Sequence, residues 1–151
     1  MKIDRDEINK TVFYWLLIAK KDLIENYDRL GLRASGKYEK DLEVTETKTG
    51  GNIKSAKHWG AMEYGRKKSE NEGDIPLWKI IAEWVKVKGI TPQYGTIEQM
   101  IFAITKKIHK FGIKVPNKYN AGKVVSSVIT DDRIDRLAEA IKKNVLNGFN
   151  K

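Results

Sequence analysis

The chain has 151 residues, no cysteine and a formal net charge of +9. A chain of this length buries roughly 70% of the surface that it exposes when unfolded, so we expect one domain, 1–151, with one core. The absence of cysteine excludes disulfides and thiolate metal sites, which makes the cytoplasm of a cell the default location. The acidic start of the chain and an apolar run limited to Val12–Ala19 predict a soluble chain without a secretory signal or a membrane span.

The positive charge is concentrated in the middle of the sequence. Residues 1–52 contain ten basic and ten acidic residues, residues 53–130 contain fourteen and six, and residues 131–151 contain five and four. A local excess of this kind can attract phosphate groups or an acidic protein surface. Lysines also keep helix surfaces hydrated without any partner, and the sequence leaves this choice open.

The first predicted element is a helix over residues 4–29. Its apolar residues recur at the spacing of one helix face: Ile8, Val12, Trp15, Leu16, Ala19, Leu23 and Tyr27. Asp4 and Glu7 form a capping-box pattern, and Gly31 is a helix stop. Three further apolar residues lie off this face: Phe13, Leu17 and Ile18. This second face indicates a partner surface, although a second helix packed on the same side would need the same pattern.

A β-hairpin is predicted after the first helix. Residues 38–47 alternate apolar and polar side chains with the period of two that is typical of a half-buried strand. The glycine-containing stretch 49–52 predicts a tight turn, because glycine accepts positive φ, and residues 53–64 form the returning strand. The loop 66–74 has no apolar residue, so we expect it to be exposed and mobile.

Two helices are predicted in the second half of the chain. The first begins with Asp74 as its cap and Pro76 in its first turn, where proline removes only a donor that has no helical acceptor. Gly89 ends this helix. The capping box TIEQ then begins a helix that extends over residues 97–111.

The chain is predicted to end with a strand and a helix. Residues 124–129 are rich in β-branched side chains, which favours a third strand, and Thr130 caps a helix that extends to Gly148. The order of elements is helix, hairpin, two helices, strand and helix. This order is typical of the α+β class, with a small antiparallel or mixed sheet of about three strands packed by four helices.

The sequence has no arrangement of side chains that is typical of catalysis, cofactor binding or metal binding. The two histidines, His58 and His109, lack a neighbouring nucleophile motif or ligand spacing. Asp131 and Asp132 occupy the first turn of a helix, where the helix dipole favours acidic residues without a metal. We therefore expect no enzymatic activity and assign no catalytic, cofactor or metal residue. A hydrolase centred on His58 would require a pocket that the sequence does not reveal.

Four features carry a resemblance when they are taken in order. A helix precedes the glycine turn 34–38 and the strand 41–47. The run Met62–Arg66 then contains an aromatic residue followed by a glycine, as at the end of a strand. The tryptophan helix IPLWKIIAEWVKVKGI and the basic helix AITKKIHKFG follow. In this set the sequence resembles the tail-completion or neck proteins of long-tailed bacteriophages, a family of minor tail or head–tail joining proteins. The likeness covers most of the chain.

The resemblance implies a structural virion protein without enzymatic activity or cofactor. It implies a ring of roughly six or twelve identical subunits between the head connector, or portal-side proteins, and the tail tube or other tail proteins. The implied location is the neck or tail of the virion, after assembly in the host cytoplasm and near packaged DNA. No membrane contact is implied.

A closed ring requires two different patches on each subunit, one of which contacts the other patch of the next subunit. Our candidates are the second apolar face of the first helix and the loop 66–74, which begins with Arg66, Lys67 and Lys68. Because this loop has no apolar residue of its own, we expect it to become ordered only on assembly.

The competing function is a small basic nucleic-acid-binding protein. Lys106, Lys107, Lys110 and Lys114 would then contact phosphates, with binding that weakens steeply as salt rises. Duplex DNA that passes through a ring must slide, and dense basic contacts around the channel would hinder it. For this reason the sequence reading favours a protein partner for the basic residues.

Overall fold

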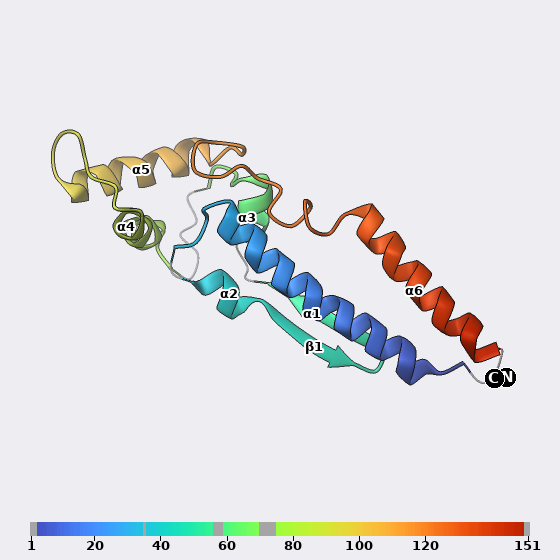
Figure 1. Ribbon diagram of the computed structural model, residues 1–151. Helices are drawn as coiled ribbons and strands as arrows, with labels where there is room; N and C mark the ends of the chain where they lie inside the picture. Colours follow the sequence, from blue (N-terminus) through green and yellow to red (C-terminus); the bar gives the residue numbers. More distant parts are fainter. Residues whose placement is uncertain (1–2, 35, 56–58, 70–74, 150–151) are drawn as a thin grey trace.

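The computed structural model describes residues 3–34, 36–55, 59–69 and 75–149. Within these ranges the molecule is a mostly helical α+β structure with six helices and one two-stranded antiparallel hairpin (Figure 1). The elements in chain order are α1 (Arg5–Arg29), α2 (Lys37–Asp41), β1 (Glu43–Thr47), β2 (Gly50–Lys54), α3 (Trp59–Tyr64), α4 (Leu77–Lys88), α5 (Ile97–Phe111) and α6 (Asp131–Phe149). The predicted class is confirmed, but the sheet has two strands where about three were expected.

The molecule is elongated. The α4–α5 pair forms one end, and the start of α1 and the end of α6 form the other (Figure 1). α1 lies between the hairpin and α6 and contacts both of them. This long helix is therefore the element around which the first half of the fold is built.

α1 forms as its periodicity predicts. The Asp4 carboxylate accepts a hydrogen bond from the Glu7 N–H at 3.2 Å, and Gly31, just beyond the helix end, has a φ of +68°. These are the expected helix-start and helix-stop contacts. All of the side chains on the predicted inward face are buried or half-buried.

The two glycines of the hairpin lie in β2 and not in the turn, which residues 48 and 49 form. A Cβ atom on Gly50, where φ is +119°, would lie 2.8 Å from the Val12 Cβ. A Cβ atom on Gly51 would lie 2.9 Å from the Leu16 Cδ1. The glycines therefore allow α1 to pack directly against the strand, which is a different role from the turn that the sequence predicted.

Part of each predicted hairpin strand is helical. Residues 37–41 form α2 ahead of β1, and residues 59–64 of the predicted returning strand form α3. Both segments contain strong helix formers, with Lys and Glu in α2 and Ala, Met and Glu in α3. Residues 56–58, which include His58, lie outside the described residues.

The predicted third strand, 124–129, is a turn. Asn26 of α1 donates from Nδ2 to the Val124 carbonyl at 2.8 Å, and the Glu63 carboxylate accepts from the Val125 N–H at 2.8 Å. Side chains thus satisfy backbone groups that a neighbouring strand would satisfy in a sheet. The β-branched composition of this segment does not make it a strand. The N–H groups of Ser127, Val128 and Ile129 donate to carbonyls three or four residues earlier, and side chains of two helices bind the remaining groups named above.

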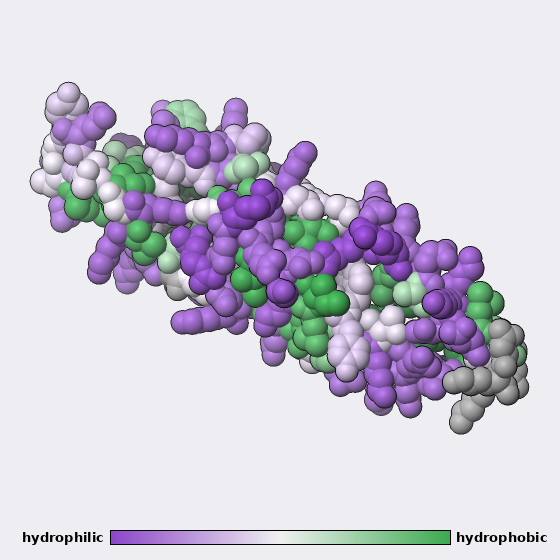
Figure 2. Space-filling model, viewed as in Figure 1, coloured by the Kyte–Doolittle hydropathy of each residue, from purple (hydrophilic) through white to green (hydrophobic). Residues whose placement is uncertain are grey.

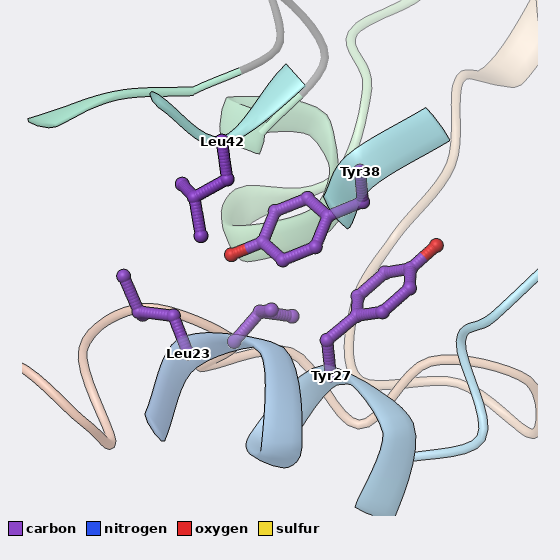
Figure 3. Packing of buried hydrophobic residues seen from close by; sticks show 5 residues of the cluster. Leu23, Tyr27, Tyr38 and Leu42 are labelled. Carbon is purple, nitrogen blue, oxygen red and sulfur yellow. The ribbon is translucent and has the colours of Figure 1, made fainter. Parts of the chain in front are cut away.

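The main core lies where α1, α2 and the turn 124–129 meet. Its buried side chains are Leu23, Tyr27, Tyr38, Leu42 and Val124. In Figure 3, Leu23 and Tyr27 on α1 face Tyr38 and Leu42. The rings of Tyr27 and Tyr38 stack with their centroids 4.3 Å apart, and burial raises the pKa of Tyr38 to about 12. Its phenol therefore stays neutral in the core.

A second hydrophobic cluster joins α4 to α5. Its buried residues are Leu77, Ile81, Val85 and Ile108. α4 follows Pro76 and ends at Gly89 with a φ of +62°, and the reciprocal capping box of Thr96 and Gln99 begins α5, as predicted. Asp74, the expected cap of α4, lies outside the described residues. The fold therefore has two hydrophobic clusters where the sequence predicts one core.

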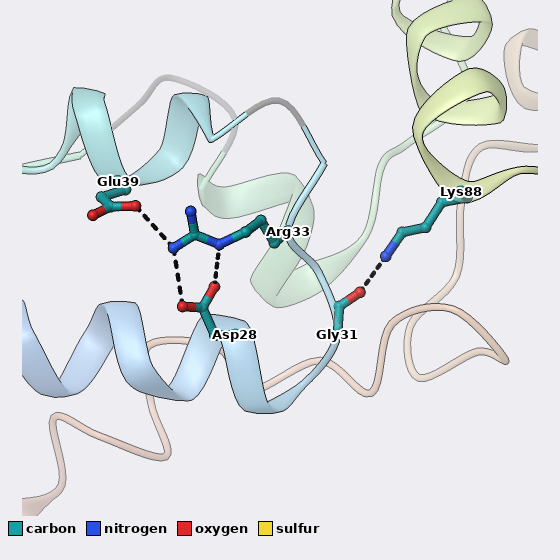
Figure 4. A network of polar contacts seen from close by, with 5 residues as sticks. All are labelled: Asp28, Gly31, Arg33, Glu39 and Lys88. Atoms are coloured by element: carbon teal, nitrogen blue, oxygen red, sulfur yellow. Dashed lines mark hydrogen bonds and ion pairs between the residues drawn. The ribbon is translucent and has the colours of Figure 1, made fainter.

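Polar contacts connect the ends of α1 and α4 (Figure 4). Arg33 lies between Asp28 and Glu39, with nitrogen–oxygen distances of 2.7 Å and 2.8 Å, and its hydrogen bonds hold the pKa of Asp28 below the usual value. Lys88 of α4 donates to the Gly31 carbonyl. The Arg33 ion pairs thus join α1 to α2, and the Lys88 hydrogen bond joins α1 to α4. Because the ion pairs are exposed to solvent, they orient α2 on α1 more than they stabilise it.

Candidate functional site

The middle of α1 exposes a hydrophobic patch. Tyr14, Leu17 and Ile18 have the spacing of neighbours on a helix surface and are 63%, 40% and 57% exposed; we call them the α1 patch. Figure 2 shows hydrophobic atoms over the middle of α1. Leu17 and Ile18 were predicted contacts. Tyr14 was missed, although its three- and four-residue spacing from the other two could have identified it.

Phe13, the third predicted contact on α1, faces the hairpin. Its side chain is half-buried, and its Cδ2 atom lies 3.4 Å from the position that a Cβ atom on Gly51 would take. Phe13 therefore packs within the subunit and does not belong to the exposed patch.

α6 presents a second apolar surface. It is a 19-residue amphipathic helix in which no residue is buried. Its apolar face consists of Ile134, Ala138, Ile141, Val145 and Phe149, which we call the α6 stripe. Ile141 and Val145 are half-buried, whereas Ile134, Ala138 and Phe149 are exposed. The packing of α6 on α1 thus covers only part of this face.

Polar side chains attach α6 to α1. Arg133 forms an ion pair with Asp22 at 2.7 Å and lies over the Trp15 ring, 5.6 Å from its centroid. Asn144 donates from Nδ2 to the Thr11 hydroxyl at 2.7 Å. An open cavity of about 560 Å³ borders Trp15 and Asp22, but the two arginines that line it, Arg133 and Arg136, are each already in an ion pair. The seam therefore orients α6 and does not present a charged binding site.

Residues 66–69 are held against the C-terminal end of α5. Arg66 and Ile113 exchange two backbone hydrogen bonds, at 2.8 Å and 2.7 Å. Gly112, with a φ of +72°, makes this approach possible, because a Cβ atom there would lie 2.1 Å from the Arg66 carbonyl oxygen. The start of the predicted loop is thus hydrogen-bonded to α5.

The next residues of this segment follow the same surface. The Ser69 carbonyl oxygen lies 2.6 Å from the Nδ1 atom of His109, which is half-buried. Lys67 and Lys68 are exposed, as predicted. The rest of the predicted loop, 70–74, lies outside the described residues.

This attachment places the basic segment 66–69 beside the basic C-terminal end of α5. We call the region the basic face and define it by its cationic residues: Arg66, Lys67, Lys68, Lys106, Lys107, Lys110 and Lys114. None of these residues forms an ion pair with an acidic side chain in the part of the chain that the structure describes. From the sequence alone the two segments are predicted to have different functions, because the contact between Arg66 and Ile113 is not visible there.

Glu63 is a buried carboxylate on α3. Burial opposes its ionisation, but hydrogen bonds from Ser126 and from the backbone N–H groups of the turn hold its pKa below the usual value. The N–H groups of Val125 and Ser126 lie 2.8 Å and 3.2 Å from its oxygens. Because backbone N–H groups of the turn bind both of its oxygens, this carboxylate joins α3 to the turn and has a structural role.

The described ranges contain no group of three or more His, Cys, Asp or Glu side chains that could hold a metal ion. None of the helices in these ranges is long and apolar enough to cross a bilayer. The surfaces defined above are therefore the candidate functional features of the described chain. Comparison with known protein families, with curated proteins and with solved structures finds no match to this chain.

Proposed function

We propose that this chain is a structural virion protein that forms a closed ring at the head–tail junction of a tailed bacteriophage and has no enzymatic activity. In this proposal roughly six or twelve subunits form the ring, which contacts the head connector or portal-side proteins and the tail proteins. The ring assembles in the host cytoplasm. The main support for assembly is the large solvent-accessible surface area of the single chain.

The single chain exposes much more surface than a compact protein of its mass. Its accessible surface is 11154 Å² for a mass of 17.3 kDa. Folded monomers of this mass expose about 7,800 Å², so the excess is about 3,300 Å². Obligate interfaces bury roughly 2,000–5,000 Å² from both partners together, and a ring subunit contributes half of two such interfaces. The excess is thus of the size that assembly into a ring would remove.

Much of the exposed surface is hydrophobic. In the described part of the chain, eighteen large hydrophobic side chains are exposed and eleven hydrophobic residues are buried. Contiguous apolar patches on a protein surface mark interaction sites. The α1 patch and the α6 stripe are two such surfaces, and they lie on different helices.

Two unlike surfaces are what a ring requires. In a head-to-tail interface one surface of a subunit contacts the other surface of its neighbour, and a fixed rotation closes the ring. In the proposed ring the α1 patch of one subunit contacts the α6 stripe of the next subunit. The placement at the head–tail junction is supported by the resemblance of the four ordered sequence features.

A mixing experiment tests this assignment. One variant carries Leu17→Glu and Ile18→Glu in the α1 patch, and the other carries Ile134→Glu and Ala138→Glu in the α6 stripe. Each variant alone is expected to be monomeric by native mass spectrometry, whereas the unmodified chain forms rings. An equimolar mixture is expected to form dimers and nothing larger, because only one competent pair of surfaces remains.

The control for the mixing experiment is Tyr94→Glu, which changes an exposed aromatic residue outside both surfaces and is expected to leave rings intact. Rings formed by either double variant alone would refute the assignment of that surface. An unmodified chain that stays monomeric at every soluble concentration would refute self-assembly. The location is tested separately, by immunogold electron microscopy of intact particles, where label at the head–tail junction is expected.

A further inference from the structure

The basic face is a feature that the proposed ring does not use. It lies on segment 66–69 and on the C-terminal half of α5, at the end of α5 that is next to α3 (Figure 1). None of its residues belongs to the α1 patch or to the α6 stripe, so contacts through those two surfaces do not use it. Binding of a partner at this face would depend on the charges of the single chain and would not require the ring.

Among the described residues, no acidic side chain forms an ion pair with the lysines of α5. Lys106 and Lys110 are one helical turn apart, Lys107 is adjacent, and all three are exposed. The only acidic residue of the helix, Glu98, lies in the first turn, where hydrogen bonds from its own backbone N–H and from Thr96 hold its pKa below the usual value. Its charge is thus stabilised at the N-terminal end of α5, away from the lysines.

The contact with segment 66–69 enlarges this charged surface. Arg66 is fixed by its two backbone hydrogen bonds to Ile113, and the backbone at Lys67 and Lys68 approaches Gly112 closely. The side chains of Lys67 and Lys68 are exposed beside the end of the helix that carries Lys110. Residues 66–123 contain twelve basic and five acidic residues, so this part of the chain has a net positive charge.

The chemistry of this face fits a polyphosphate backbone better than a protein partner. Protein interfaces have an apolar centre and are depleted in lysine. The basic face brings together six lysines and one arginine, beside the exposed ring of Phe111 over which the Lys110 ammonium lies. Lysine is a point charge that contacts phosphate without fixed geometry. Such contacts are independent of base sequence and allow a protein to slide along DNA. Lysine contacts of this kind therefore need not stop a duplex from sliding through a ring.

We propose that the basic face binds the phosphate backbone of nucleic acid, with duplex DNA as the partner and without base specificity. The face is the combined surface of segment 66–69 and α5, so residues about forty positions apart in the sequence contribute to one binding site. Ring formation is not required for binding, because the isolated chain already carries the complete surface.

Fluorescence anisotropy with a short labelled duplex, measured over a series of salt concentrations, tests the proposal. The test variant is Lys106→Gln with Lys110→Gln. The matched control is Lys142→Gln with Lys143→Gln on α6, which removes the same charge from exposed positions outside the face. The test variant is expected to bind about tenfold more weakly at low salt and to lower the slope of log K against log salt by about two.

The α6 control is expected to change affinity by less than about twofold. A second test variant, Lys67→Gln with Lys68→Gln, is expected to weaken binding as the α5 variant does, because the fold places both pairs on one surface. Equal losses in the test and control variants would overturn the proposal, since net charge alone would then explain binding. Tighter binding of poly-glutamate than of duplex at the same salt would also overturn it, in favour of an acidic protein partner. Circular dichroism checks that every variant is folded.

The two proposals fail independently of each other. Loss of DNA binding with intact rings would refute only the role of the basic face. Rings that are absent while salt-dependent DNA binding persists would refute only the assembly surfaces.

Discussion

The α1–hairpin half and the α4–α5 half of this molecule differ both in how they pack and in the charge that they carry. The first has a core with two stacked tyrosines, and buried polar side chains fix the neighbouring turn. Its residues 1–52 are balanced in charge. The second has a small aliphatic core and a large excess of lysine. The difference indicates that the first half holds the fold together, while the second carries charge on a simple helical support.

The largest effects are expected from cavities in the two cores. Leu42→Ala removes a buried side chain of the first core and is expected to lower the free energy of unfolding of the whole chain by about 3 kcal/mol. Ile81→Ala in the second core is expected to lower hydrogen-exchange protection mainly in α4 and α5. Native-state exchange measured by mass spectrometry distinguishes the two results. Equal loss of protection in α1 after Ile81→Ala would show that the halves unfold as one unit.

A slightly smaller effect is expected where α1 packs on β2. Gly50→Ala places a Cβ atom 2.8 Å from Val12 at a φ of +119°, and is expected to cost about 2–3 kcal/mol through overpacking and backbone strain. Gly60→Ala in α3 is the matched control, because no atom lies within 4 Å of its Cβ position. The control is expected to be neutral or to stabilise the helix by about 0.5 kcal/mol. Urea unfolding followed by circular dichroism measures both, and equal stability of the two variants would contradict the close packing.

The smallest of the three effects depends on pH and concerns Glu63. Because its pKa in the fold is below the usual 4.5, its ionised form stabilises the protein above that pH, and this contribution is lost as the pH falls through the lower folded pKa. Glu63→Gln is expected to cost about 2 kcal/mol at neutral pH. The difference from the unmodified chain should shrink below pH 4.5.

The control for this measurement is Glu25→Gln, which changes an exposed carboxylate on α1 and should alter stability by less than about 0.5 kcal/mol at any pH. A constant difference between Glu63→Gln and the unmodified chain from neutral to acidic pH would show that the charge of Glu63 does not stabilise the turn.

The sequence predicts elements whose signals are local. α1, α4, α5 and α6 were found because their apolar spacing and end signals lie within each helix. The third strand was wrong because residues 124–129 form local turn hydrogen bonds and bind Asn26 and Glu63, which are far away in the sequence. The roles of Gly50 and Gly51 were missed for the same kind of reason, since they depend on which helix packs above them.

The candidate surfaces also divide into features that local sequence patterns predict and features that depend on tertiary packing. Leu17 and Ile18 could be identified from the helical pattern alone, because they lie off the inward face of α1. The pattern could not show that Phe13 faces the hairpin, since this depends on tertiary packing. Nor could it show that Lys67 and Lys68 share a surface with α5, because the bridge between Arg66 and Ile113 spans a long stretch of sequence.

The close approach of β2 to α1 also predicts how related chains would vary. Position 50 faces position 12, and position 51 faces position 16, at distances that leave no room for an additional carbon atom. A homologue with alanine or a larger residue in the strand would need a smaller residue at the facing position of the helix. Side-chain size at these two pairs should therefore covary among descendants of a common ancestor, whereas the lysines of α5 could exchange places with neighbouring positions as long as the charge is conserved.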